Sequence, residues 1–106
     1  MEATPREIVV CEDDEGRQPF ALWLIALKDA KTKAVILTRI RRVEDGNFGD
    51  VSPIGDGVSE LRIDFGPGYR VYFGQIGSEV HIISGGTKKT QPGDIKAARE
   101  FWSKYA

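Results

Sequence analysis

The segment LRIDFGPGYRVYF, residues 61–73, carries the clearest fold signal in the sequence. Apolar and polar side chains alternate on both sides of a Gly-Pro-Gly corner, a pattern typical of two half-buried antiparallel strands joined by a turn. The register that keeps apolar side chains on one face has a three-residue turn, and it pairs Phe65 with Tyr69, Ile63 with Val71 and Leu61 with Phe73. On the opposite face this register aligns Asp64 with Arg70 and Arg62 with Tyr72.

A second hairpin follows directly, with the Gly77-Ser78 pair suited to a tight turn. We therefore expect a meander of three strands near 58–65, 69–76 and 79–84, in which Phe73 lies opposite Ile82, Tyr72 opposite Ile83 and Gly74 opposite His81. The β-branched segment 6–12 predicts one further strand. Residues 45–57, rich in glycine and aspartate, are expected to form a surface loop.

The apolar residues recur at helical spacing in three other segments. Phe20, Trp23, Leu24 and Leu27 predict a helix from Pro19 onward. A second helix is expected from about Thr32 to Asp45, and a third over 91–106, with Pro92 in its first turn. The predicted class is α+β: a mostly antiparallel four-stranded sheet with two N-terminal helices and a C-terminal helix.

The length and composition fit a single domain over 1–106. Hydrophobic residues make up 41% of the chain, enough for one modest core, and no apolar run reaches the roughly 20 residues that span a membrane. No secretory signal pattern is found, so we expect a cytoplasmic protein without a membrane partner. Cys11 stands alone and is expected to be a small buried residue.

Basic side chains gather on the polar face of the predicted meander. Six of the 16 acidic residues lie in the first 15 positions, so the rest of the chain is mildly basic. Arg62, Arg70 and Tyr72 share the face opposite the apolar one, and Lys88 and Lys89 follow the last strand. This pattern allows two interpretations: an ordinary solvated surface, or a site for an anion.

Several other chemistries are excluded by composition. One histidine and one cysteine cannot form a standard zinc site, and neither a phosphate-binding glycine loop nor a GxSxG motif is present. No metal or cofactor is expected.

The segments GNFGDVSPIGDGVSELRIDFGPGYRVYF and GGTKKTQPGDIKAA closely resemble the phage-derived addiction-module killer proteins, HigB-like members of the RelE/ParE toxin superfamily. The similarity extends from about Phe20 to Ala98. It implies a RelE/ParE-like fold and the toxin component of a type II toxin–antitoxin system. The implied partners are a cognate antitoxin, of helix-turn-helix type, and messenger RNA on the ribosome, which RelE-type relatives cleave without metal.

The resemblance also assigns roles to residues. Arg70 matches the arginine that RelE-type nucleases place at the scissile phosphate. Lys88 matches a further basic residue that these enzymes have after the final strand. Arg62 belongs to the family's ELR segment. With Tyr72 these residues form our predicted catalytic set, and the predicted RNA-binding residues are Lys89, Arg39 and Arg42. The tyrosine of RelE-type sites has no match, because Asp94 stands at that spacing, and the HigB-type histidines are missing.

The residue that removes the 2′-hydroxyl proton is left open by the sequence. Tyr72 would need cations nearby to stabilise its phenolate, His81 has the most suitable intrinsic pKa, and Glu60 is a further candidate. Two alternatives to an endoribonuclease therefore remain. One is a ParE-like toxin that inhibits DNA gyrase, and the other is a catalytically decayed module that binds an antitoxin.

Overall fold

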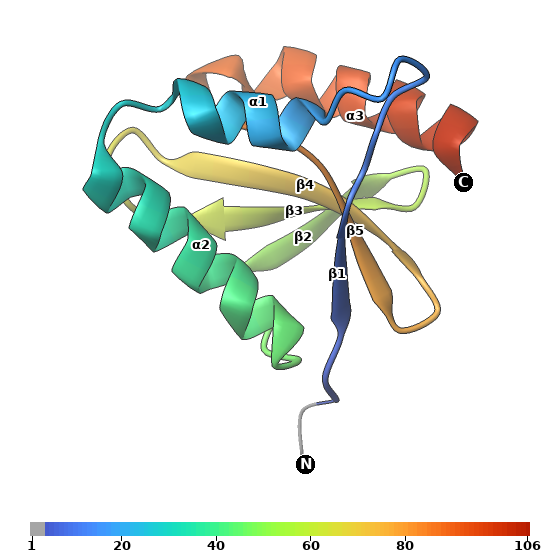
Figure 1. The fold of residues 1–106 in the computed structure, drawn as a ribbon, viewed down its shortest axis with the longest axis horizontal. Helices are drawn as coiled ribbons and strands as arrows, with labels where there is room; N and C mark the ends of the chain where they lie inside the picture. Colours follow the sequence, from blue (N-terminus) through green and yellow to red (C-terminus); the bar gives the residue numbers. More distant parts are fainter. Residues whose placement is uncertain (1–3) are drawn as a thin grey trace.

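The computed structural model describes residues 4–106 and shows an α+β fold of three helices and a five-stranded mixed sheet (Figure 1). In chain order the elements are β1 (Glu7–Val10), α1 (Pro19–Ala26), α2 (Ala30–Glu44), β2 (Val51–Gly55), β3 (Val58–Ile63), β4 (Tyr69–Ile76), β5 (Glu79–Thr87), the 3-10 helix η1 (Lys88–Thr90) and α3 (Gln91–Tyr105). The predicted α+β class is confirmed. The predicted number of four strands is wrong, because β2 forms within the segment assigned to a loop.

The sheet has the strand order β1-β5-β4-β3-β2. β1 pairs with β5 in parallel, and the other neighbours pair antiparallel. β2 contains Pro53 and lies at an edge of the sheet, where a residue without a backbone N–H is tolerated. Its sequence VSPIG has little strand character, which explains why residues 45–57 gave a loop prediction.

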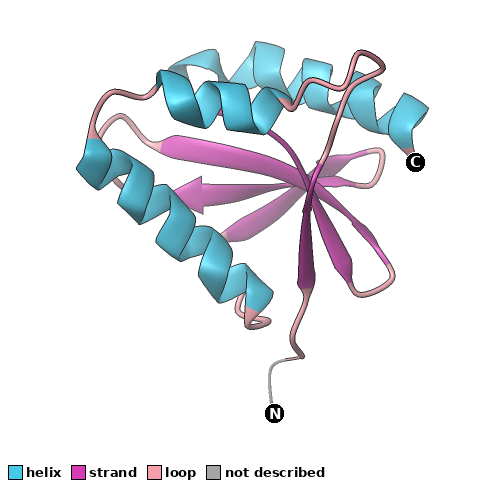
Figure 2. Ribbon diagram, viewed as in Figure 1, coloured by secondary structure: helices cyan, strands magenta, loops and turns pink. Residues whose placement is uncertain are grey.

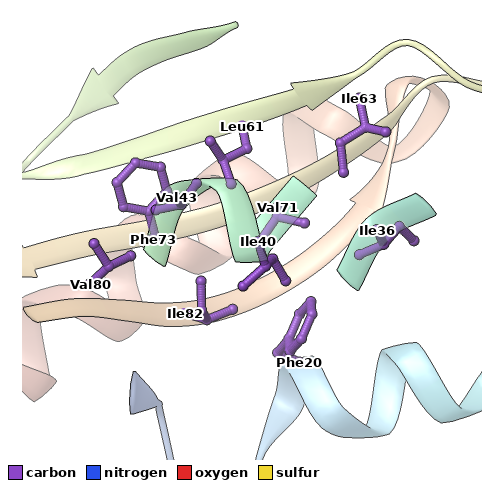
Figure 3. Close-up of a cluster of buried hydrophobic side chains, with 10 residues drawn as sticks. All are labelled: Phe20, Ile36, Ile40, Val43, Leu61, Ile63, Val71, Phe73, Val80 and Ile82. Carbon is purple, nitrogen blue, oxygen red and sulfur yellow. The ribbon is translucent and has the colours of Figure 1, made fainter. Parts of the chain in front are cut away.

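Helices pack on both faces of the sheet (Figure 2). On one face, Phe20 of α1 and three apolar residues of α2 meet the inner side chains of β3, β4 and β5 (Figure 3). On the other face, Ala98 and Trp102 of α3 pack on Val58, Tyr72 and Ile83. The expectation of one open polar face is therefore wrong over most of the sheet, because α3 covers it. Cys11 is fully buried in this second cluster, as predicted.

The helix predictions agree well with the structure. α2 begins at Ala30, ahead of the predicted Thr32, because the Asp29 side chain caps it: Asp29 accepts hydrogen bonds from Lys31 N at 3.2 Å and from Thr32 Oγ1 at 2.7 Å. α3 begins at Gln91, followed directly by Pro92.

The hairpin registers were predicted in part. The Gly77-Ser78 turn and the pairs Phe73–Ile82 and Gly74–His81 are confirmed. The predicted β3–β4 register is wrong by two residues. In the structure, Ile63 pairs with Tyr69 and Arg62 with Arg70, and the turn between the strands has five residues. A shift of two keeps every side chain on its predicted face. Tyr72 pairs with Ser84 instead of Ile83, because a β-bulge adds a residue to β5 at this point.

Candidate phosphate-binding site

The five-residue turn between β3 and β4 brings together the ends of β4 and β5. Gly66 and Gly68 adopt positive φ angles of 56° and 82°, which glycine reaches at little cost. The backbone N–H of Lys88 donates to the carbonyl of Gly68 at 2.7 Å. A methyl group on Gly68 would lie 3.5 Å from Lys88 Cβ and 3.8 Å from Arg70 Nη1, so both basic residues lie against this turn.

A cavity of about 370 Å³ opens beside the turn. It is lined by Arg62, Arg70 and Lys88, by the turn residues 66–68, and by two carboxylates, Asp50 and Asp64. Three of the four predicted catalytic residues are thus brought to one place, although they lie up to 26 positions apart in the sequence. Two guanidinium groups and one ammonium group outnumber the two carboxylates, so an anion in this cavity would meet a net positive charge.

Arg62 is held by carboxylates on its own side of the sheet. Its Nε donates to Glu60 Oε1 at 3.1 Å, and its Nη1 lies 3.7 Å from Asp50 Oδ1. Glu60 is only 2% exposed and also accepts from Gln91 Nε2, at 2.8 and 3.1 Å. Because Arg62 and Arg70 lie directly opposite each other in the ladder, these carboxylates offset a repulsion between like charges.

Arg70 is less fully satisfied. Its Nη1 donates to the carbonyl of Tyr69 at 3.1 Å, while its buried Nε has no hydrogen-bond partner within residues 4–106. A buried donor without a partner costs free energy, and such atoms are uncommon in folded proteins. The guanidinium therefore has hydrogen-bonding capacity that the described residues leave unused.

The sequence analysis placed Tyr72 on an open cationic surface, and this prediction is wrong. It is fully buried under α3, and its hydroxyl has no partner among the residues described. Burial raises its pKa well above the ordinary value, Asp94 and Glu60 raise it further, and Arg70 opposes them. A catalytic base needs the opposite shift, so the environment argues against a phenolate at this position.

A second, larger cavity of about 750 Å³ adjoins the first. Arg39 and Arg42 of α2 line it, and it shares Asp50, Arg62 and Asp64 with the smaller cavity. Both predicted RNA-binding residues of α2 are thus placed beside the cationic cavity. Lys89 is exposed on η1 and lines neither cavity.

His81 lies at the other end of the sheet. It is 7% exposed, and its Nδ1 lies 2.6 Å from Tyr105 Oη at the end of α3. It pairs with Gly74, whereas Arg70 pairs with Gly86, five residues further along β5. At the usual rise per residue this separation is roughly 17 Å. His81 is therefore not placed to act on a group bound by Arg70.

The two carboxylates at the cavity were missed as site residues by the sequence analysis. Asp64 had been aligned with Arg70 as a surface pair, and Asp50 lay in a predicted loop. The signal available was the alternation of charge in ELRID, where Glu60, Arg62 and Asp64 share one face. The contribution of Asp50 depends on β2, which could not be predicted.

The fold and site thus define an α+β domain with a cationic cavity at one end of its sheet. The chain is 51% identical over 81 residues to a protein of Haemophilus influenzae described as uncharacterized, an alignment that covers 76% of this chain and 82% of that protein. The chain belongs to the same family as that protein. No family model matches the chain. No solved structure matches it either. Among the described residues, no helix is both long and apolar enough to cross a membrane.

Proposed function

We propose that this protein is the toxin component of a type II toxin–antitoxin pair with a RelE/ParE-like fold, and that it cleaves messenger RNA bound to the ribosome. The observation that carries the proposal is the cavity lined by Arg62, Arg70 and Lys88. The resemblance of the hairpin and GGTKKTQ segments to addiction-module toxins supplies the reaction. In this proposal the protein acts in the cytoplasm and is neutralised by a helix-turn-helix antitoxin.

The chemistry required is the transfer of an RNA phosphodiester to its own 2′-hydroxyl. The 2′ oxygen attacks the phosphorus, the bond to the 5′ oxygen breaks, and the products are a 2′,3′-cyclic phosphate and a 5′-hydroxyl. Arg70 binds the phosphate oxygens as negative charge develops on them, and Arg62 assists. A preorganised donor of this kind typically contributes about 2.7–4 kcal/mol to the transition state.

Two proton transfers complete the reaction. Asp64 is exposed at the cavity and forms no ion pair within residues 4–106, so its carboxylate is free to accept the 2′ proton. Asp50, by comparison, faces Arg62 Nη1 at 3.7 Å. Lys88, at the other side of the Gly68 turn, donates a proton to the leaving 5′ oxygen. The ribosome contributes by holding the RNA in a reactive geometry.

A second candidate is a toxin of this fold that binds its target without cleaving RNA, as a ParE-like inhibitor of DNA gyrase does. The burial of Tyr72 and the remote position of His81 favour it, because neither residue can serve as a base in the cavity. An antitoxin-binding module without activity is the third possibility.

The test is controlled expression in bacteria, with the 5′ ends of cellular RNA mapped before and after induction. We expect new 5′-hydroxyl ends with the wild-type chain and a loss of about 100-fold or more with Arg70→Ala. Arg99→Ala is the matched control, because Arg99 is exposed and pairs with Asp56 at 2.9 Å, away from both cavities. Growth arrest with unchanged RNA ends and gyrase-dependent DNA damage would favour the second candidate, and no arrest would favour the third.

A further inference from the structure

We propose that the larger cavity binds one nucleobase of single-stranded RNA, next to the phosphate held by Arg62, Arg70 and Lys88. The inference rests on the proposed function and extends it from the reacting phosphate to the base beside it. The cavity measures about 750 Å³, within the usual range for small-molecule sites. Its lining includes Ala34, Val35 and Ile63, which together offer an apolar surface to the face of a base.

The two cavities are neighbours that share part of their lining. Asp50, Arg62 and Asp64 line both, so a ligand whose phosphate lies against Arg62 has its neighbouring group at the entrance to the larger cavity. A free phosphate would fill only the smaller cavity. A nucleotide supplies a charged group and a flat, largely apolar group that are joined by one sugar, and this combination matches the two cavities.

The guanidinium of Arg39 is fixed in the wall of the larger cavity. Its Nη2 donates to the carbonyl of Asp50 at 3.2 Å, and its Nη1 has no partner within residues 4–106. A side chain at Gly49 would approach Nη2 to 2.8 Å, so glycine leaves room for this position. Burial, with a smaller contribution from Arg42, lowers the pKa of Arg39. A planar, immobilised guanidinium is a surface on which RNA bases commonly stack.

The carboxylates favour a base over an acidic peptide in this cavity. Asp50 and Asp64 can accept hydrogen bonds from the N–H groups of a base, and the side-chain carboxylates of such a peptide have no group to donate. Lys31 and Arg42 at the same cavity leave positive charge for a flanking phosphate. The arrangement therefore separates sites for phosphate from sites for base edges.

The experiment uses the ¹⁵N-labelled full chain, inorganic phosphate, and an RNA trinucleotide whose 2′-O-methyl groups prevent cleavage. Thr38 is exposed at the cavity, so Thr38→Trp fills the cavity without disturbing the core. Leu37→Trp is the matched control, because Leu37 is 46% exposed on the same helix and lines neither cavity. We expect Thr38→Trp to weaken trinucleotide binding by about tenfold, the typical value of one stacked base, and to leave phosphate binding unchanged.

The outcomes separate this inference from the function on which it rests. A trinucleotide that binds no more tightly than phosphate, or that tolerates Thr38→Trp as well as Leu37→Trp, would overturn the base site alone. Displacement of the trinucleotide by a short acidic peptide at equal concentration would also overturn it, in favour of a protein ligand. Phosphate binding that is insensitive to Arg70→Ala would count against the proposed function itself.

Discussion

The two ends of α3 contact two polar clusters that differ in how well their atoms are satisfied. At the C-terminal end, His81 lies between Glu79 Oε1, 3.0 Å from Nε2, and Tyr105 Oη, 2.6 Å from Nδ1. Both ring nitrogens of His81 therefore have a partner, and we call His81, Glu79 and Tyr105 the closed cluster. At the N-terminal end, Arg70 and Tyr72 form what we call the open cluster, in which Arg70 Nε and the Tyr72 hydroxyl have no hydrogen-bond partner within residues 4–106.

This difference indicates which of the two clusters has hydrogen-bonding capacity left for a ligand. A fully bonded buried network stabilises one arrangement of the chain, whereas unpaired buried atoms cost stability and are found where a ligand or a reaction needs them. The closed cluster contains the one histidine of the sequence, which its residue type makes a candidate for catalysis. Arg70, whose Nε has no partner among the described residues, instead lines the cationic cavity.

The largest effect on stability is expected from Glu60→Ala, beside the open cluster. Glu60 is 2% exposed and accepts hydrogen bonds from Arg62 and Gln91, so its removal leaves two donors without an acceptor and a void beneath α3. We expect a loss of about 3 kcal/mol in the free energy of unfolding, measured with urea. The exposed Glu100→Ala is the control, and equal values for the two variants would contradict the buried role of Glu60.

The next largest effect is a loss of folding stability at alkaline pH, caused by Cys11. The Cys11 side chain is hydrogen-bonded to Tyr105 of the closed cluster. Burial raises the pKa of the Cys11 thiol from 9.0 to about 11. Because the folded pKa is raised, the contribution of the thiol is complete below pH 9 and is lost as the pH rises towards 11. Between these values, wild type should lose roughly 2 kcal/mol more than Cys11→Ala. Parallel stability curves for the two proteins would refute this explanation.

A smaller loss is expected from Tyr105→Phe in the closed cluster. The variant removes the hydroxyl that lies 2.6 Å from His81 Nδ1, and it leaves that nitrogen without its partner. The expected cost is about 1 kcal/mol, with phosphate binding unchanged, because the cluster is remote from the cavity. A loss of phosphate binding with intact stability would show that the two ends of α3 are coupled.

The smallest effect is expected from Tyr72→Phe, the matched substitution at the other end. Its hydroxyl is buried without a partner among the described residues, so its removal should change stability by less than about 0.5 kcal/mol or increase it. RNA cleavage should persist, which would exclude Tyr72 as a base. A cost equal to that of Tyr105→Phe would mean that an ordered water satisfies this hydroxyl.

The sequence predicted those features that depend on local periodicity. The helical spacing of the apolar residues from Phe20 to Leu27 predicted α1. The Gly77-Ser78 pair between two apolar segments predicted the tight turn between β4 and β5. The alternation around residues 66–68 assigned every side chain of the hairpin to its correct face. For this reason the convergence of Arg62, Arg70 and Lys88 was predicted even though the register was wrong by two.

Features that depend on distant packing were not predicted. The apolar stripe of α3 requires an apolar partner surface, and Val58, Tyr72 and Ile83 supply it on the face expected to be polar. Tyr72 could therefore be mistaken for a surface residue, since tyrosine has both an apolar ring and a polar tip. β2 forms because β3 offers a free edge, a tertiary effect that overrides the poor strand propensity of Pro53.

The β-bulge at Ile83 has a consequence for how the chain tolerates changes in length. The extra residue lets Ile82 and Ile83 face opposite cores and still places Gly86 opposite Arg70. Deleting Ile83 would remove the bulge and leave Ser84 opposite Tyr72 and Gly86 opposite Arg70, so the residues that follow, Lys88 included, would keep their positions. A single-codon deletion at this position would therefore leave the charge of the cavity unchanged and would instead remove an apolar side chain from the core beneath α3.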